Sequence, residues 1–388
     1  MDLDSHYLQS YFSLLNPLKN KSLKKIIIFV LHELSIGGSQ RVLVNLANAF
    51  VEEGYIVHFC LFKKRGELLQ NLHKEVIIHD LNSTRVLTGV FSYFSLIYQL
   101  KPNVVFTGIT HVNIITSLLI PFFRLFYVNS IFVSRESNNP SIRAKYLKKS
   151  KRLDFVYTKT ISNFDLIIAQ SKFMRTDLIN AYDLNGNNVI VVNNPLDYKS
   201  VQIKAIERIE EKFIHSNKIN IVSVGGLRYQ KGFDLLLNVV KASKDDYHFH
   251  IVGEGAEREK ISQLILEAKI QDKVTIHGSR KNPYKYIYQA DLVVLSSRYE
   301  GFPNVILEAN ACGKFVIAFK SPGVDDEIIT EGLNGSLVDF KDYSSFLKKI
   351  DFYSSSGTDK EAIFSSVKKY DSKKIAERYI NLFDNYKI

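Results

Sequence analysis

The sequence predicts an α/β protein made of two doubly wound, Rossmann-like domains that face a central cleft. Short apolar runs alternate with longer segments of helical periodicity, which is the pattern of strand and helix repeats in parallel sheets. A polar, charge-rich stretch at 197–217 interrupts this alternation, which then starts again. The length of 388 residues also favours two hydrophobic cores over one.

Five segments are expected along the chain. They are an N-terminal amphipathic extension (1–24), a first Rossmann-like domain (25–197), a linker (198–217), a second Rossmann-like domain (218–365) and a C-terminal helix that crosses back to the first domain (366–388). The predicted strands are 25–31, 55–62, 76–80, 103–107, 130–134, 166–170, 189–193, 219–225, 247–253, 273–278, 291–296, 314–319 and 335–340. Because ligands bind beyond the carboxyl ends of parallel strands, the loops after these runs are candidate site segments.

Composition excludes several classes of protein. No apolar run reaches the roughly 20 residues that span a bilayer, and the nearest, 113–127, is interrupted by Pro121 and Arg124 and predicts a buried helix. Cys60 and Cys312 are too few and too distant for a disulfide framework or a CxxC metal site, so we expect buried free thiols. The acidic N-terminus lacks the features of a secretory signal, which favours a cytoplasmic protein.

The net charge of +11 bears on partners rather than on the fold. Six basic residues and no acid lie within 143–152. Such a cluster suits anionic lipid headgroups or nucleic acid, and it is equally typical of a solvated face; we expect no nucleic-acid partner. The extension has apolar residues at helical spacing, and its helix can pack on the body of the protein, pair with a second subunit or lie in a membrane interface. We favour the first.

The loop "IGGSQRV" follows the strand at 25–31 and opens a helix near Gln40. Gly37 and Gly38 allow the backbone to approach a ligand, and the amides at the helix start favour an anion. A tight connection without a ligand is the plain alternative.

The loop "GGLRYQKGFDLLL" follows the strand at 219–225 and also opens a helix. Gly226, Arg228 and Lys231 therefore gather at a strand end, which suits the negative charge of a diphosphate. It lacks the GxxxxGK[ST] order of a Walker loop.

The stretch "YEGFPNVILE" sets two carboxylates eight positions apart. Pro303 is placed at a helix start, so the amides near Asn304 and Val305 can face a phosphate, with Glu308 one turn into the helix and Glu300 on the loop before it. The two carboxylates can thus address different parts of one elongated ligand. One can accept two hydrogen bonds from a ribose diol, and the other can bind a sugar hydroxyl or stabilise positive charge on an anomeric carbon. Two solvated glutamates are the alternative.

Two further loops complete the set. "GSRKNPYKYIYQAD", with Arg280, follows the strand at 273–278 and can wall a base pocket. "FKSPGVDDEI" follows the strand at 314–319 and can reach the sugar end of such a ligand. Both are also typical of plain connections.

In combination these motifs resemble glycosyltransferase family 4. The resemblance covers about residue 25 to 370 and rests on the order "GGSQR", "SRESNNP", "AQSKFMRTDL", "VNNPLD", "GLRYQKGFDLLL", "IVGEGAERE", "NPYKYIYQADLVVLSSRYEGFPNVILEANACGK" and "EIITEGLNGSLV". Glu300 and Glu308 form the family's E-x7-E element. The resemblance implies a GT-B fold and a retaining transfer of a sugar from a nucleotide diphosphate, usually UDP, with no metal ion and no cofactor.

The resemblance also implies roles for residues. Glu308 would hold the ribose hydroxyls, and Glu300 would lie at the donor sugar near its reacting carbon. The implied catalytic residues are Glu300, Lys231 and Arg228. The implied donor-binding residues are Gly38, Gly226, Lys231, Arg280, Glu300, Phe302, Pro303, Asn304, Val305 and Glu308.

The chain departs from the family pattern at two places. Gly226 stands where the family usually has an arginine, and Arg228 is the candidate substitute. The segment "SRESNNP" lacks the histidine that many members have near the donor sugar, and His111 in "GITHVN" is the candidate in its place. The expected acceptor-binding residues are Gly37, His111, Arg135, Glu136 and Asn138.

The function implied by the resemblance is hexosyl transfer from a donor such as UDP-N-acetylhexosamine or UDP-hexose. The expected acceptor is a glycan or a polyprenyl-diphosphate-linked glycan in bacterial surface polysaccharide synthesis. The cluster at 143–152 and the N-terminal helix would lie against the anionic inner face of the cell membrane. A GT-B-like sugar-nucleotide epimerase is one alternative. A catalytically silent subunit that binds donor or a partner glycosyltransferase is the other, for which Gly226 is the argument.

Overall fold

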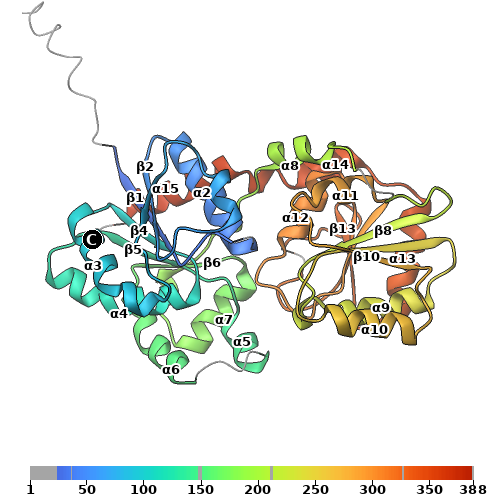
Figure 1. The fold of residues 1–388 in the computed structure, drawn as a ribbon, viewed down its shortest axis with the longest axis horizontal. Coiled ribbons are helices and arrows are strands. Elements are labelled where there is room, and N and C mark those ends of the chain that lie inside the picture. The colour runs from blue at the N-terminus through green and yellow to red at the C-terminus, as the bar shows by residue number, and fades with distance from the viewer. Residues whose placement is uncertain (1–23, 36, 147–150, 210–212, 326, 387–388) are drawn as a thin grey trace, which may run out of the picture.

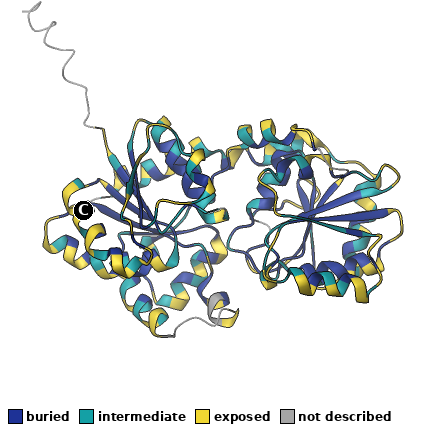
Figure 2. Ribbon diagram, in the orientation of Figure 1, coloured by how far each residue is buried: buried dark blue, intermediate teal, exposed yellow. Residues whose placement is uncertain are grey.

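The structure, a computed structural model, describes residues 24–35, 37–146, 151–209, 213–325 and 327–386; the predicted N-terminal helix lies outside them. The chain forms two parallel-sheet domains side by side (Figure 1). All thirteen runs predicted as strands form strands. In both domains the sheets are buried and the outer faces of the helices are exposed (Figure 2), as expected of parallel sheets covered on both sides.

The first domain contains a seven-stranded sheet in the order β3-β2-β1-β4-β5-β6-β7. The strands are β1 (Ile26–Leu31), β2 (Ile56–Leu61), β3 (Ile77–Asp80), β4 (Val104–Thr107), β5 (Ile131–Arg135), β6 (Leu166–Ala169) and β7 (Val189–Val191). The α-helices are α2 (Gly38–Glu52), α3 (Val90–Leu100), α4 (Thr110–Leu125), α5 (Pro140–Tyr146), α6 (Lys151–Thr160) and α7 (Lys172–Tyr182). Alternate residues of β1 enter two separate cores, one on each face of the sheet.

The second domain repeats this plan with six strands in the order β10-β9-β8-β11-β12-β13. The strands are β8 (Ile219–Val224), β9 (Tyr247–Val252), β10 (Val274–Gly278), β11 (Leu292–Leu295), β12 (Val316–Phe319) and β13 (Gly335–Val338). The α-helices are α8 (Tyr198–Ala205), α9 (Phe233–Ala242), α10 (Arg258–Glu267), α11 (Tyr284–Gln289), α12 (Asn304–Ala311), α13 (Tyr343–Ser355) and α14 (Lys360–Ser366). Strand order reverses beside the first strand of each sheet, where doubly wound proteins bind ligands.

The last helix, α15 (Ser372–Asn385), returns from the second domain and packs against α2 of the first (Figure 1). Its Tyr379 and Phe383 are buried, with the Tyr379 ring 5.4 Å from that of Phe106 and the Phe383 ring 6.1 Å from that of Phe50. The returning chain lies beside the outgoing one, because the amide of Leu196 donates to the Tyr370 carbonyl at 2.7 Å. The two segments that pass between the domains, near Leu196 and near Tyr370, therefore form one hydrogen-bonded connection, which we call the hinge.

The segment that we assigned to a linker is partly structural. Its first residues form α8, capped by Asp197, whose side chain accepts from the Ser200 amide at 3.0 Å. Val201 and Ala205 of α8 are buried in the core of the second domain. An amphipathic helix in a charge-rich stretch explains why composition alone pointed to a linker.

The helix predicted within 113–127 is present as α4, but only one of its faces is buried. Leu118, Phe122 and Leu125, spaced four and three residues apart, form an exposed apolar stripe. No described helix is long and apolar enough to cross a membrane. The two cysteines are buried free thiols, as predicted.

Candidate active site

Between the domains lies a pocket of about 610 Å³, which we call the cleft pocket. Its walls are loops at the carboxyl ends of β1, β5, β6 and β7 in the first domain and of β8, β9, β10 and β11 in the second. Both sheets therefore present their ligand-binding edge to the same space.

Two helices begin at this pocket. The N-terminus of α2 is Gly38 and that of α12 is Asn304, and a Cβ atom placed on Gly38 would lie 3.7 Å from the Asn304 side-chain nitrogen. The Asn304 Oδ1 atom accepts from Asn194 at 2.6 Å. Helix starts carry unsatisfied amides and partial positive charge, so two that meet across a cleft form a site for an anion.

Glu300 is 5% exposed, and three donors satisfy its carboxylate. Lys231 Nζ and Ser297 Oγ each donate to its Oε1 at 2.6 Å, and the Gln230 side chain donates to Oε2 at 3.2 Å. Its backbone oxygen accepts from Asn139 of the first domain at 2.9 Å. A buried carboxylate is stable only with such partners, so Glu300 is fixed in direction at the cleft wall.

Cationic groups line the cleft beside Glu300. Lys231 ends a 3-10 turn, η6 (Tyr229–Lys231), after β8. Arg228, one residue before that turn, has an exposed side chain that makes no hydrogen bond or ion pair with the described residues. At Gly226 a Cβ atom would meet nothing nearer than 3.4 Å, and that neighbour is the Arg228 Nε atom. The two cations are therefore available at the edge where a diphosphate was predicted.

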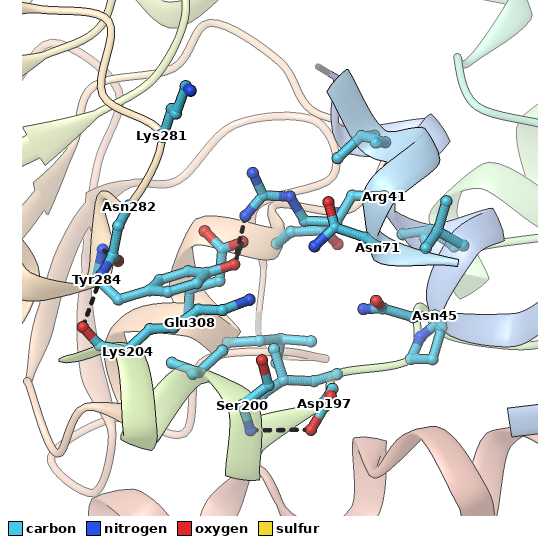
Figure 3. A pocket seen from close by; sticks show the side chains of 18 of the residues that line it. Arg41, Asn45, Asn71, Asp197, Ser200, Lys204, Lys281, Asn282, Tyr284 and Glu308 are labelled. Atoms are coloured by element: carbon cyan, nitrogen blue, oxygen red, sulfur yellow. Dashed lines mark hydrogen bonds between the residues drawn. The ribbon is translucent and has the colours of Figure 1, made fainter. Parts of the chain in front are cut away.

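Glu308 belongs to an interdomain chain of polar groups. Arg41 of α2 donates to the Tyr284 hydroxyl, and that hydroxyl donates to Glu308 Oε1 at 3.4 Å (Figure 3). Burial raises the pKa of Glu308, whereas the charge of Arg41 and the hydrogen bond from Tyr284 oppose the rise. Figure 3 views this group from a hinge-side pocket of about 260 Å³ that also contains α8 residues.

The structure brings most of the predicted donor-binding residues together. Gly38, Gly226, Arg280, Phe302, Asn304 and Val305 line the cleft pocket together with Lys231, Glu300 and Glu308. Arg280 donates to the Tyr286 hydroxyl at 2.8 Å. Pro303 precedes α12 as expected but does not line the pocket.

Of the predicted acceptor-binding residues, Gly37, Arg135 and Asn138 line the cleft pocket. Arg135 is only 1% exposed; one terminal nitrogen donates to Asn194, and the other has no partner among the described residues. Burial lowers the pKa of Arg135. A buried guanidinium with an unused donor at a pocket wall is suited to bind an acceptor or donor oxygen.

Glu136 was placed wrongly. Its carboxylate is inside the first domain, where Oε1 accepts from Asn113 at 2.8 Å and from Tyr157 at 2.5 Å. Successive side chains leave a strand on opposite faces, so the side chain after Arg135 at the end of β5 turns away from the cleft. Glu136 thus stabilises the interior.

His111 does not line the cleft pocket. It is exposed in the first turn of α4, where its ring lies 5.7 Å from that of His32. The loop after β4 therefore does not carry this side chain to the donor site.

Sequence reasoning missed several residues of the site, among them Arg41, Asn194 and Gln230, which line the cleft pocket, and Tyr284, which lines the hinge-side pocket. All four lie inside quoted motifs, at the final arginine of "GGSQR", the second asparagine of "VNNPLD", the glutamine of "GLRYQKGFDLLL" and the first tyrosine of "NPYKYIYQAD". Near Arg41, Gln230 and Tyr284 we predicted other residues as site residues because they are glycines or carry a charge. Nothing in the local sequence indicates that Arg41 of the first domain contacts Tyr284 of the second.

The chain matches known protein families along most of its length. The family described as Glycosyltransferase Family 4 matches residues 36–200, and the family described as Glycosyl transferases group 1 matches residues 205–378. The N-acetylgalactosamine-N,N'-diacetylbacillosaminyl-diphospho-undecaprenol 4-alpha-N-acetylgalactosaminyltransferase of Campylobacter jejuni is 28% identical over 58% of this chain and 60% of that protein. The amylovoran biosynthesis glycosyltransferase AmsD of Erwinia amylovora is 24% identical over 84% of this chain and 89% of that protein.

Solved structures share the architecture. Anabaena Alr3699/HepE in complex with UDP superposes with a TM-score of 0.74 at 18% identity, over 93% of this chain and 100% of that one. The lipopolysaccharide outer core galactosyltransferase WaaB has a TM-score of 0.71 at 19% identity, over 93% and 100%. The predicted GT-B fold class is thereby confirmed.

Removing Lys231 should destabilise the protein, because Glu300 would remain buried without its cation. We expect Lys231→Ala to lower the free energy of unfolding by about 1–3 kcal/mol. The double variant Lys231→Ala/Glu300→Gln should recover much of this loss, since the remaining amide carries no charge. Urea unfolding of the wild type, both single variants and the double variant measures the coupling. Strictly additive effects would contradict a stabilising ion pair.

Proposed function

Because the chain belongs to glycosyltransferase family 4, we propose that it transfers a hexosyl unit from a UDP-linked sugar, with retention of configuration, to a glycan or lipid-linked glycan during bacterial surface polysaccharide synthesis. One observation carries the proposal: Glu300 and Glu308 line the same pocket as two cations and two helix starts. Ribose, diphosphate and sugar each have a matching group there. The relatives named for related transfers agree with this assignment.

In the proposed reaction the bond between the sugar C1 and the diphosphate oxygen breaks, and a bond from C1 to the acceptor oxygen forms on the same face. The acceptor proton passes to an oxygen of the departing diphosphate. Lys231, Arg228 and the amides at the starts of α2 and α12 neutralise the charge that develops on that diphosphate. No metal ion or cofactor is required in this scheme, because these groups supply the positive charge.

Glu300 acts in this scheme as an electrostatic and hydrogen-bonding group, not as a nucleophile. Its oxygens already accept from Lys231, Ser297 and Gln230, and each bond lowers the reactivity of the lone pairs. It can orient a sugar hydroxyl and stabilise positive charge near C1.

The first test is donor binding and slow donor hydrolysis against a panel of nucleotide sugars. We expect one UDP-sugar class to raise the melting temperature of the wild type and to be hydrolysed equally with and without EDTA. Glu308→Ala and Lys231→Ala, each compared with its own melting temperature without ligand, should lose the response, because they remove the ribose and diphosphate contacts. Lys241→Ala, an exposed lysine on α9, is the matched control.

Failure of the wild type to respond to any nucleotide sugar would contradict the proposal. The silent-subunit alternative would then gain support, and Gly226→Arg would test it, because a side chain at that position has room.

UDP affinity should fall at low pH as Glu308 becomes protonated. The carboxylate accepts the ribose hydrogen bonds only when ionised, so affinity is full above its pKa and is lost as pH falls through it. Arg41→Gln and Tyr284→Phe remove groups that oppose the raised pKa of Glu308, so the midpoint of the loss should move to higher pH in both. Calorimetric titration of UDP from pH 5 to 8 measures it. A uniform weakening with an unchanged midpoint would indicate a merely structural role.

We also propose that the protein works at the cytoplasmic face of an anionic membrane. The N-terminal extension and Lys148 and Lys149 lie outside the described residues, but another surface supports the same partner. Helices α3 and α4 contact each other, and we call the apolar side chains exposed on them and on the residues beside them the α3–α4 face: Leu87, Phe91, Tyr98, Leu118, Phe122, Leu125, Phe126 and Tyr127. Phe91 is 87% exposed and Tyr127 is 83% exposed.

The charge around this face favours lipid as its occupant. No aspartate or glutamate occurs in the sequence between Asp80 and Glu136, and Arg85 and Lys101 are exposed within that stretch. Aromatic and aliphatic side chains on a segment that carries cations and no acid are typical of surfaces that lie in the headgroup region of an anionic bilayer.

Loss of two exposed phenylalanines should weaken binding to vesicles. We expect the double variant Phe91→Ser/Phe122→Ser to bind phosphatidylglycerol vesicles at least about tenfold more weakly in co-sedimentation, because it can no longer bury the apolar area of two rings in the bilayer. UDP binding should be unchanged. Phe352→Ser, an exposed ring on α13 of the second domain, is the control. Equal loss in the control, or no sedimentation of the wild type, would contradict the proposal.

A further inference from the structure

A second interdomain pocket, of about 540 Å³, shares a wall with the cleft pocket, and we call it the tyrosine pocket. Consecutive residues divide between the two: Tyr229 and Tyr299 line the tyrosine pocket, whereas Gln230 and Glu300 line the cleft pocket. The hydrogen bond from Asn139 to the Glu300 carbonyl joins the two domains between them. The segment "FKSPGVDDEI", which we expected to reach the sugar end of the donor, lines this pocket with Lys320, Ser321 and Pro322, and none of its described residues lines the cleft pocket.

Aromatic rings from both domains line this pocket. Tyr146 at the end of α5 stacks on Tyr299, with ring centroids 5.0 Å apart and planes at 16°. Tyr229, Phe340, Tyr146 and Phe173 are each between 36% and 45% exposed, so part of each ring is accessible. Rings with one accessible face and a polar edge are suited to pack against the apolar faces of sugar rings.

Among the described residues, all the charged side chains that line the pocket are positive. Lys145, Lys320, Lys341 and Arg298 line it, and no aspartate or glutamate does. Arg298 is paired with Asp234, with Nη2 and Oδ2 2.6 Å apart. The three lysines make no ion pair or hydrogen bond through their side chains with the described residues. Lys145 Nζ lies 5.2 Å from the Tyr146 ring centroid and Lys341 Nζ 5.6 Å from that of Phe340, so no described acidic group neutralises these charges and a ligand anion can pair with them.

A buried polar group provides an independent sign of an unfilled site. Ser321 lines the same pocket, is 9% exposed, and its hydroxyl has no hydrogen-bond partner among the described residues. Buried hydroxyl groups in folded proteins are ordinarily paired. The loops that carry Ser321 and Lys341 follow β12 and β13, at the ligand-binding edge of the second sheet.

We propose that the tyrosine pocket binds an anionic glycan, namely a negatively charged segment of the acceptor that lies beyond the reacting sugar. The rings bind the sugar faces, and the lysines bind carboxylate or phosphate groups. This inference rests on the proposed function for the identity of the glycan as acceptor. Because both domains line the pocket, such a ligand contacts both and stabilises the arrangement in which Asn139 donates to the Glu300 carbonyl.

The experiment measures binding of pentagalacturonate, an acidic oligosaccharide, by the full chain in saturating UDP. Maltopentaose is the neutral control, and inorganic diphosphate tests whether phosphate alone suffices. We expect pentagalacturonate to bind and maltopentaose not to bind. Lys320→Glu and Lys341→Glu, on separate loops, should each weaken binding at least about tenfold, whereas Lys241→Glu, with the same charge change on α9, should not. Phe340→Ala should weaken it as well.

Several outcomes overturn the proposal. The first is that the wild type binds no pentagalacturonate, and the second is that it binds maltopentaose as tightly as pentagalacturonate. The third is that Lys241→Glu weakens pentagalacturonate binding as much as Lys320→Glu and Lys341→Glu do. The fourth is that inorganic diphosphate at the same concentration displaces all of the bound pentagalacturonate. UDP binding and donor hydrolysis are measured on the same variants and should be unchanged. If the wild type binds the acidic oligosaccharide but no nucleotide sugar, the proposed function fails and the pocket stands. If the wild type binds a nucleotide sugar but not the acidic oligosaccharide, only the proposal for the tyrosine pocket is rejected.

Discussion

The burial of one carboxylate organises the centre of this protein. Glu300 is withdrawn from water, and removing an ionised group from water costs several kcal/mol unless partners compensate. The loop after β8 supplies Lys231 and Gln230, and the loop after β11 supplies Ser297. These loops are neighbours because β8 and β11 pair in the sheet. The position where strand order reverses therefore determines which side chains can satisfy Glu300.

The same loop is the contact between the domains. Gly301 has no space for a side chain, since an added Cβ would lie 2.7 Å from the Ser137 carbonyl oxygen of the first domain. Asn139 binds the preceding carbonyl, and Tyr146 stacks on Tyr299. Together with the hydrogen bond between Leu196 and Tyr370, where the chain crosses between the domains, these contacts fix Glu300 relative to both domains. Residues from the first domain can then complete a site whose charges belong mainly to the second.

Much of this arrangement follows from local sequence, and the remainder depends on long-range contacts. Strands and helix starts were predictable because burial on both faces gives continuous apolar runs, and glycine or proline marks their ends. Glu136 was misplaced because adjacent positions at a strand end point in opposite directions, and a motif does not state which points to the cleft. Arg41 and Tyr284 were missed because 243 positions separate them. The exposed stripe of α4 has the same composition as a buried face, so sequence alone does not distinguish the two.

The absence of an arginine at Gly226 has a structural counterpart. The Arg228 Nε atom lies 3.4 Å from the point where a Cβ of residue 226 would begin, so the Arg228 side chain is in van der Waals contact with that position. The positive charge is thus kept, but it is carried by a side chain anchored two residues later. That side chain is exposed and unpaired, and fixing it on a ligand costs about 1.5–2 kcal/mol of rotamer entropy. Lys231, by contrast, is already held by Glu300. The proposed diphosphate would therefore meet one cation in place and one that it must order itself, so part of the electrostatic site would form only on binding.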